Sequence, residues 1–332
     1  MSRVVRSRVR VLVLAIVSGL LLLPWSISSA SAAPPTDTSP SKISVLRSGT
    51  TNYVFGKSSS ANSIVYRNIA ANNSWKTIPG TTSIVSGPSA VINGSQAWVF
   101  ATGSNGQLYY TKTSDFTTWS AWSSLGGSFV GSPAAVTGSP TRNNSLAVAG
   151  RNTTDGTYSF RYLQGATWSS WYSAGPEVYT TSPALTLPFG VPGDFGAWNL
   201  SIAGVKSPGA SLFEVGFSID TGTIDPGPSR VASGGFSGAT NARSTLATNA
   251  QGRDGFFWYR TTTNTLSNWP NRDVASGSVL STPGVATSGV NNWICVKATT
   301  AGAVSCTTQT LDLAINDFGP YAAFVSLGGA VA

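Results

Sequence analysis

The chain has 332 residues, with 20 Lys and Arg against 12 Asp and Glu, two Cys and no His. Without histidine, Ser-His-Asp and Cys-His nucleophile pairs and the usual histidine-based zinc sites are excluded. Charged residues make up 10% of the chain, against about a quarter in typical proteins, and no basic cluster follows the first ten residues. We therefore expect no nucleic-acid partner, no metal and no cofactor.

The first 32 residues predict a cleavable secretory signal peptide. Four arginines precede an apolar run from Val11 to about Pro24, and small residues lead to the Ala30-Ser-Ala32 site. The alternative is a membrane anchor, but this run is shorter than the roughly 20 apolar residues that a spanning helix needs. We expect a secreted protein that has no membrane contact after cleavage near Ala32. Residues 33–42 are rich in Pro, Ser and Thr and predict a loose linker.

A short phrase recurs between residue 43 and the end of the chain. Ser132-Pro133-Ala-Ala-Val has variants that begin at Ser86, Ser182 and Ser281, with weaker copies near Ile43 and Ser244. An apolar run follows each start, as in residues 97–101, and predicts a second strand. Asn105-Gly106 and Asp155-Gly156 then stand before a third run, and such pairs between apolar runs are strong hairpin signals.

The two clearest units end on paired tryptophans. Trp119-Ser-Ala-Trp122 leads to Leu125-Gly-Gly, and Trp168-Ser-Ser-Trp171 closes the next unit. Each unit thus predicts three or four short antiparallel strands over about 45–50 residues, which matches one blade of a β-propeller. Because one blade cannot bury both of its faces, we expect the units to stack in a ring.

The sequence therefore predicts one all-β domain over residues 43–332, a single β-propeller with six blades. The irregular fourth unit and the incomplete last unit leave five or seven blades open, and a pair of β-sandwiches is the competing arrangement. Closure of a ring requires the unit at Ile43 to meet the segment Phe324–Gly329.

Cys295 and Cys306 flank a predicted turn centred on Thr300 and Ala301. A tight turn there would place the two cysteines opposite each other on paired strands, at a separation close to that of a disulfide. Since export favours oxidation, we expect a disulfide that staples one hairpin; two free thiols are the alternative.

The repeated unit resembles the blade of the PLL-type lectins, named for a Photorhabdus lectin, and of related tectonin-like propellers. The resemblance rests on the Ser-x-Pro-Ala start, the Asn-Gly or Asp-Gly turn and the Trp-x-x-Trp-x-x-Leu-Gly-Gly ending. It covers residues 43–332 and is clearest over residues 86–175. It implies a ring that binds fucose or related sugars in shallow pockets between neighbouring blades, lined by aromatic and polar side chains.

The candidate sugar-binding residues lie around the closing tryptophans, because aromatic rings pack against the apolar faces of sugars. They are Trp119, Trp122, Trp168, Trp171, Tyr172 and Arg161. Trp122 and Trp171 equally fit a role in the core of the repeat. Four other tryptophans in central strand runs are expected to pack between blades: Trp98, Trp198, Trp258 and Trp293.

We expect a secreted, multivalent, non-catalytic lectin with glycan partners. The first alternative is a glycoside hydrolase or sialidase-like enzyme that uses two carboxylates. The segment Thr113–Trp119 is somewhat similar to the Ser-x-Asp box of sialidases, where the box is structural, and Asp155 and Asp254 stand in turns. No acid is assigned a catalytic role. The second alternative is an adhesin or scaffold that binds a protein.

Overall fold

The structure is a computed structural model. It describes residues 42–71, 74–137, 146–186, 199–206, 211–218, 223–224, 229–232, 242–245, 255–260, 266–269, 274–275, 281, 283–288, 291–297, 302–312, 317–318, 322–329 and 331–332. The expected signal peptide and the linker up to Ser41 lie outside these residues and stay predictions. Within the described part, no helix is long and apolar enough to span a membrane.

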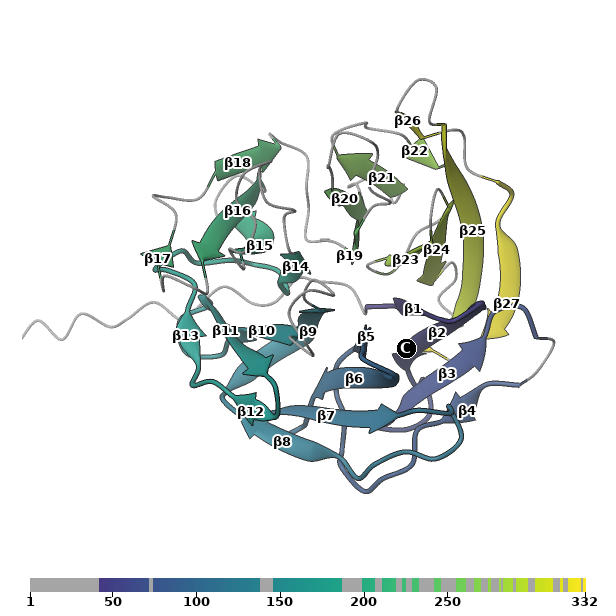
Figure 1. Ribbon diagram of the computed structural model, residues 1–332, viewed down its shortest axis with the longest axis horizontal. Helices are drawn as coiled ribbons and strands as arrows, with labels where there is room; N and C mark the ends of the chain where they lie inside the picture. The colour runs from purple at the N-terminus through teal and green to yellow at the C-terminus, as the bar shows by residue number, and fades with distance from the viewer. Residues whose placement is uncertain are drawn as a thin grey trace, which may run out of the picture. The chain divides into compact units, whose positions relative to one another are not determined.

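The described elements are β-strands, and they form six antiparallel sheets in chain order, which we call blades 1 to 6 (Figure 1). Blade 1 contains β1 (Ser44–Ser48), β2 (Thr51–Lys57), β3 (Ile64–Asn68) and β4 (Lys76–Thr77). Blade 2 contains β5 (Ser89–Asn93), β6 (Gln96–Thr102), β7 (Leu108–Thr113) and β8 (Ser123–Gly126). Blade 3 contains β9 (Phe129–Thr137), β10 (Leu146–Asn152), β11 (Tyr158–Gln164), β12 (Thr167–Trp168) and β13 (Tyr172–Ser173).

The other three blades follow the same plan. Blade 4 contains β14 (Ala184–Thr186), β15 (Asn199–Lys206), β16 (Ser211–Ser218), β17 (Thr223–Ile224) and β18 (Ser229–Ala232). Blade 5 contains β19 (Ala242–Thr245), β20 (Gly255–Arg260), β21 (Leu266–Trp269) and β22 (Val274–Ala275). Blade 6 contains β23 (Gly284–Ser288), β24 (Asn291–Lys297), β25 (Ala303–Asp312), β26 (Asp317–Phe318) and β27 (Val325–Gly329).

The first strands of the blades close a ring. Contacts run from β1 to β5, β9, β14, β19 and β23 in turn, and β23 contacts β1 (Figure 1). Each recurring start in the sequence opens one blade, including the weak copies near Ile43 and Ser244. The prediction of a six-bladed β-propeller is therefore confirmed, and the paired-sandwich alternative is wrong.

The hydrophobic core lies between neighbouring blades, as β6 shows most clearly. Successive side chains of a strand point to opposite faces. Ala97, Val99 and Ala101 accordingly join the core shared with blade 1. Trp98 and Phe100 instead join the core shared with blade 3. A strand buried on both faces explains why this run is apolar throughout rather than alternating.

The ring closes between blades 6 and 1, as expected for Ile43 and the segment Phe324–Gly329. Ile43 and Leu327 share one buried cluster. The backbone N–H of Ala332 donates to the carbonyl of Lys57 at 2.8 Å. Gly56 permits this approach, because a Cβ there would lie 2.4 Å from the Val331 side chain.

The disulfide between Cys295 and Cys306 is confirmed. The two residues are directly opposite each other on β24 and β25, with their Cα atoms 4.1 Å apart. Both cysteines are buried in the core between blades 6 and 1. The bond therefore staples a hairpin at the seam where the ring closes.

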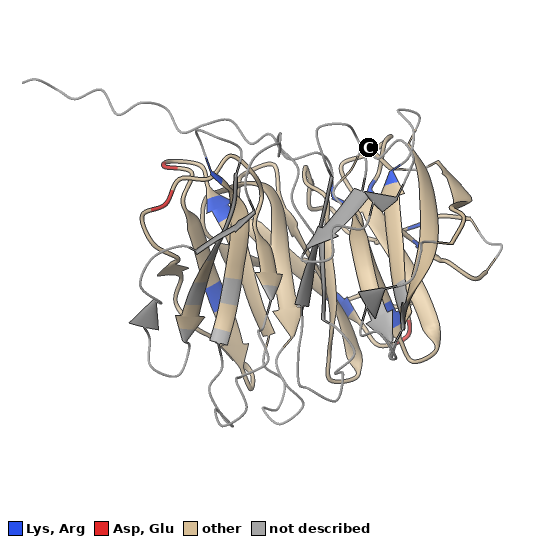
Figure 2. Cartoon of the chain, turned by 90° about the horizontal axis from the view of Figure 1, so that it is seen from above, with Lys and Arg blue, Asp and Glu red and all other residues tan. Residues whose placement is uncertain are grey.

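Lys42 precedes β1, and its buried side chain extends to blade 3. Its Nζ donates to the carbonyl of Pro133 at 2.9 Å. Burial lowers the pKa of Lys42 to about 8. The other basic residues that the structure describes are scattered over several strands and form no single cluster (Figure 2).

Candidate functional site

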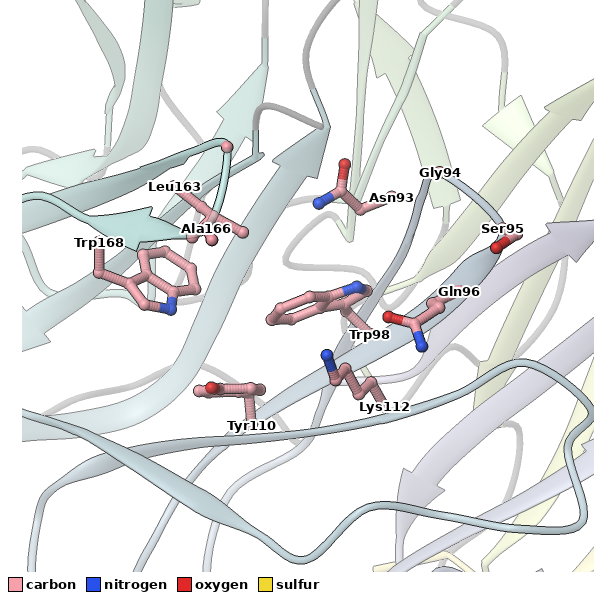
Figure 3. A pocket seen from close by; sticks show the side chains of 11 residues that line it. Asn93, Gly94, Ser95, Gln96, Trp98, Tyr110, Lys112, Leu163, Ala166 and Trp168 are labelled. Atoms are coloured by element: carbon pink, nitrogen blue, oxygen red, sulfur yellow. The ribbon is translucent and has the colours of Figure 1, made fainter. Parts of the chain in front are cut away.

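A cavity of about 370 Å³ opens between blades 2 and 3 (Figure 3). Its blade 2 side is formed by the β5–β6 turn and the faces of β6 and β7, and its blade 3 side by the turn between β11 and β12. The larger side chains that line it are Asn93, Gln96, Trp98, Tyr110, Lys112, Leu163 and Trp168. Its volume is within the range of small-molecule sites.

Trp98 forms the floor of the cavity on the blade 2 side. Tyr110, on the adjacent strand, stacks near it with the ring centroids 5.0 Å apart. Lys112 is directly opposite Trp98 in the β6–β7 ladder, and its Nζ lies 4.9 Å from the indole centroid. Trp98 is 7% exposed, and its indole N–H has no hydrogen-bond partner among the described residues. The result is an aromatic surface with a cation over the face of the indole.

The opposite wall belongs to blade 3. The ring of Trp168 faces that of Trp98 edge-on, with centroids 6.4 Å apart (Figure 3). Gly165 and Ala166 form the turn that precedes Trp168, and Gly165 has a φ of 64°, which favours glycine. Because these two turn residues are small, they leave the space in front of Trp98 open.

The polar groups of the cavity suit hydrogen bonding. Asn93 and Gln96 supply amides, Ser95 supplies a hydroxyl and Lys112 supplies an ammonium. No carboxylate lines the cavity in the part of the chain that the structure describes. The amide, hydroxyl and ammonium groups that line the cavity can hydrogen-bond a polyhydroxylated ligand.

The structure places Trp168, Trp171 and Arg161 of the predicted site at the interface of blades 2 and 3. Of these, Trp168 lines the cavity. The guanidinium of Arg161 packs between the two indoles, at 5.5 and 5.4 Å from their centroids. Its Nη1 and Nη2 donate to the carbonyls of Leu125 and Ser169. Trp171 donates its indole N–H to the Leu125 carbonyl at 3.2 Å. Arg161 and Trp171 therefore hold two blades together.

The other three candidates lie elsewhere. Trp119 and Trp122 pack at the interface of blades 1 and 2. Tyr172 is 39% exposed and stacks on Tyr162 and Phe160 of its own blade. The six residues proposed from the sequence thus do not form one site.

Sequence reasoning missed Trp98, Tyr110 and Lys112. The expectation that Trp98 packs between blades is correct, but the same ring also forms the cavity floor. The sequence did hold a signal for these residues. A hairpin around Asn105-Gly106 pairs Trp98 with Lys112, so the two side chains could have been placed side by side. Trp293 packs at the core of blades 6 and 1. Trp198 and the side chain of Trp258 lie outside the described residues.

Three acids whose side chains the structure describes, Asp115, Asp155 and Glu177, make local structural contacts. Asp115 caps its own turn by accepting hydrogen bonds from the backbone N–H groups of Thr117 and Thr118. Asp155 accepts from the N–H and hydroxyl of Thr157. Glu177 forms an ion pair with Lys206. Asp254 lies outside the described residues. These contacts agree with the structural interpretation of the turn acids and give no support to a carboxylate enzyme.

No family model matches the chain, and no curated protein matches it in sequence. The solved structures are more informative. AofleA from Arthrobotrys oligospora is 11% identical with a TM-score of 0.65, covering 89% of this chain and 91% of its own. Lectin BP39L from Burkholderia pseudomallei is 16% identical with a TM-score of 0.60. The match covers 88% of this chain and 86% of BP39L.

A third neighbour is the fungal lectin from Aleuria aurantia, described as a six-bladed β-propeller with a novel fucose recognition mode. It is 12% identical with a TM-score of 0.56, and the match covers 89% of this chain and 98% of the lectin. The chain has the six-bladed β-propeller fold. At these identities, the likeness concerns the fold and leaves the ligand to the chemistry of the cavity.

Proposed function

We propose that this protein is a secreted, non-catalytic saccharide-binding β-propeller whose described site is the cavity between blades 2 and 3. The observation that carries the proposal is the aromatic surface of the cavity, where Trp98 meets Trp168 edge to face and amide and ammonium groups lie beside the rings. An aromatic ring packs against the apolar face of a sugar, while amides and ammonium groups bond its hydroxyls.

A fucose-type sugar is the ligand that we propose. The cavity has room for a single sugar ring with its substituents. Fucose presents an apolar methyl group beside its hydroxyls, and Leu163 and Ala166 offer a small apolar surface next to Trp168. One structural neighbour, the lectin from Aleuria aurantia, is described as fucose-specific and in terms of fucose recognition, which supports this choice.

We further propose that binding is multivalent. The ring repeats the interface between blades six times. Weak sites on one rigid ring gain avidity when a surface presents several copies of a glycan. Export by the N-terminal segment would place the ring where such surfaces occur, and the buried disulfide is compatible with an oxidising compartment.

The test uses the mature chain, residues 33–332, first on a glycan array and then in calorimetric titrations with methyl fucoside. We expect binding of fucosylated glycans. In Trp168→Ala, the number of sites per chain should fall by one. Trp119→Ala is the matched control, because it removes an equivalent indole from the interface of blades 1 and 2 and should leave the number unchanged. A protein that binds no glycan would contradict the proposal, as would an equal loss in both variants.

A further inference from the structure

The interface of blades 1 and 2 is built on the same plan as the cavity between blades 2 and 3. Tyr53 occupies in blade 1 the position of Trp98 in blade 2, as the pairings Leu46 with Tyr53 and Val91 with Trp98 show. On the facing blade, Trp119 occupies the position of Trp168. Each precedes a serine, Ser120 or Ser169, whose hydroxyl oxygen accepts a hydrogen bond from a backbone N–H of the third strand.

The two interfaces differ in what stands in front of the aromatic floor. Phe116 of blade 2 lies on Tyr53 with the ring centroids 3.7 Å apart and the planes 3° from parallel. Phe116 is 7% exposed. Its carbonyl accepts a 2.6 Å hydrogen bond from the hydroxyl of Tyr66. In blade 3 the corresponding turn carries Gly165 and Ala166, and the space is open.

The turn that carries Phe116 fixes this placement. Phe116 has a φ of 55°, which a residue with a bulky side chain rarely adopts. Three hydrogen bonds hold the conformation. The backbone N–H of Phe116 donates to Oγ1 of Thr113 at 3.0 Å, and Oδ1 of Asp115 accepts from the next two backbone N–H groups. A sterically disfavoured conformation that is held so closely points to a specific task for the ring.

We propose that Phe116 is a built-in occupant of a second saccharide pocket, and that its side chain keeps the interface of blades 1 and 2 closed. The phenyl ring covers Tyr53 in the stacked geometry that the apolar face of a sugar ring would take. Phe116 in blade 2 and Gly165 in blade 3, each three residues before its tryptophan and each with a positive φ, thus determine which of two equivalent interfaces is open. This inference rests on the proposed function. If the inference holds, the β7–β8 loop sets how many saccharide sites the ring offers.

The first experiment is independent of sugars. Phe116→Ala should leave an apolar cavity over Tyr53, and such engineered cavities bind benzene. Benzene should therefore raise the melting temperature of Phe116→Ala and not that of the wild-type chain. Phe116→Gly is the second variant, because glycine adopts a positive φ without strain and so removes the backbone cost that alanine would keep. If benzene stabilises neither variant, Phe116 does not fill a pocket and the inference is overturned.

The second experiment counts sugar sites by calorimetric titration with methyl fucoside. We expect one additional site per chain in Phe116→Ala, and its loss when Tyr53→Ala is added. The reciprocal change, Gly165→Phe, should close the open cavity and remove one site. A folded Phe116→Ala chain that binds benzene but gains no site would overturn the second pocket, while wild-type binding would still support the proposed function. A wild-type chain that binds no sugar would overturn both.

Discussion

The guanidinium of Arg161 in blade 3 donates a 2.8 Å hydrogen bond from Nη1 to the carbonyl oxygen of Leu125 in blade 2. Arg67 in blade 1 makes the same contact, at 2.5 Å, with the carbonyl of Leu327 in blade 6. Each leucine belongs to a Leu-Gly-Gly phrase that ends the preceding blade. The repeated phrase therefore supplies an acceptor to the next blade around the ring.

Substitution of Arg161 tests this link between blades. Arg161→Met keeps much of the stem but removes the guanidinium hydrogen bonds to the carbonyls of Leu125 and Ser169; the Leu125 carbonyl keeps only the indole N–H of Trp171 as a side-chain donor. We expect a loss of about 1–3 kcal/mol in the free energy of unfolding, measured by urea denaturation. The number of saccharide sites should not change. Lys76→Met, at an exposed position of β4, is the control and should stay within about 0.5 kcal/mol of the wild type. A variant as stable as this control would show that the contact does not hold the blades.

Substitution of Trp98 should reduce both stability and saccharide binding, whereas substitution of Trp168 should mainly reduce binding. Trp98→Ala removes a ring that is 7% exposed and should cost about 3–5 kcal/mol of stability as well as one saccharide site. Trp168 is only partly buried, so Trp168→Ala should remove the site at a clearly smaller cost. Thermal denaturation and titration of both variants measure the two effects. Equal destabilisation would mean that Trp168 belongs to the core.

Loss of the disulfide should weaken the ring without abolishing its fold. The bond joins residues 11 apart, for which the chain-entropy relation gives about 3 kcal/mol. The double variant Cys295→Ala, Cys306→Ala should lose about this amount in denaturant unfolding. Dithiothreitol should lower the melting temperature of the wild-type chain and leave that of the double variant unchanged. An unchanged wild-type transition on complete reduction would contradict the expectation.

Because the side chain of Lys42 is buried, the free energy of unfolding should depend on pH above neutral pH. Its pKa is about 8 in the folded chain, below the ordinary value of 10.5, because burial disfavours the ammonium. Between these two values the unfolded chain binds more protons than the folded chain, so stability rises with pH. The penalty of burying the charge is complete below pH 8 and is relieved toward pH 10.5.

The measurement compares the wild-type chain with Lys42→Met between pH 7 and 10.5. The stability difference should move in favour of the wild type as the pH rises, by up to about 3 kcal/mol. Subtracting the variant removes the contribution of tyrosines and other lysines, which are common to both chains. A difference that does not vary with pH would contradict a lowered pKa for Lys42.

The sequence by itself determined the local features of this protein. The starts at Ser86, Ser132, Ser182 and Ser281, the Asn-Gly and Asp-Gly turns and the pairing of Cys295 with Cys306 all depend on residues close in the chain. Strand alternation and turn chemistry act over a few residues, so their pattern can be recognised in one dimension. Stacking of the units in a ring follows, because each unit must bury its faces against neighbours, and the structure then fixed the number of blades at six rather than five or seven.

Only the tertiary structure decided where a ligand could bind. Trp119 and Trp168 occupy equivalent positions in the repeat, yet one packs beside Phe116 and the other lines an open cavity. The difference depends on which side chains of two separate blades meet, and on whether Phe116 or a glycine, Gly165, stands in one turn. The repeat pattern alone does not reveal which interface is open, because each interface combines residues from two units that have diverged independently.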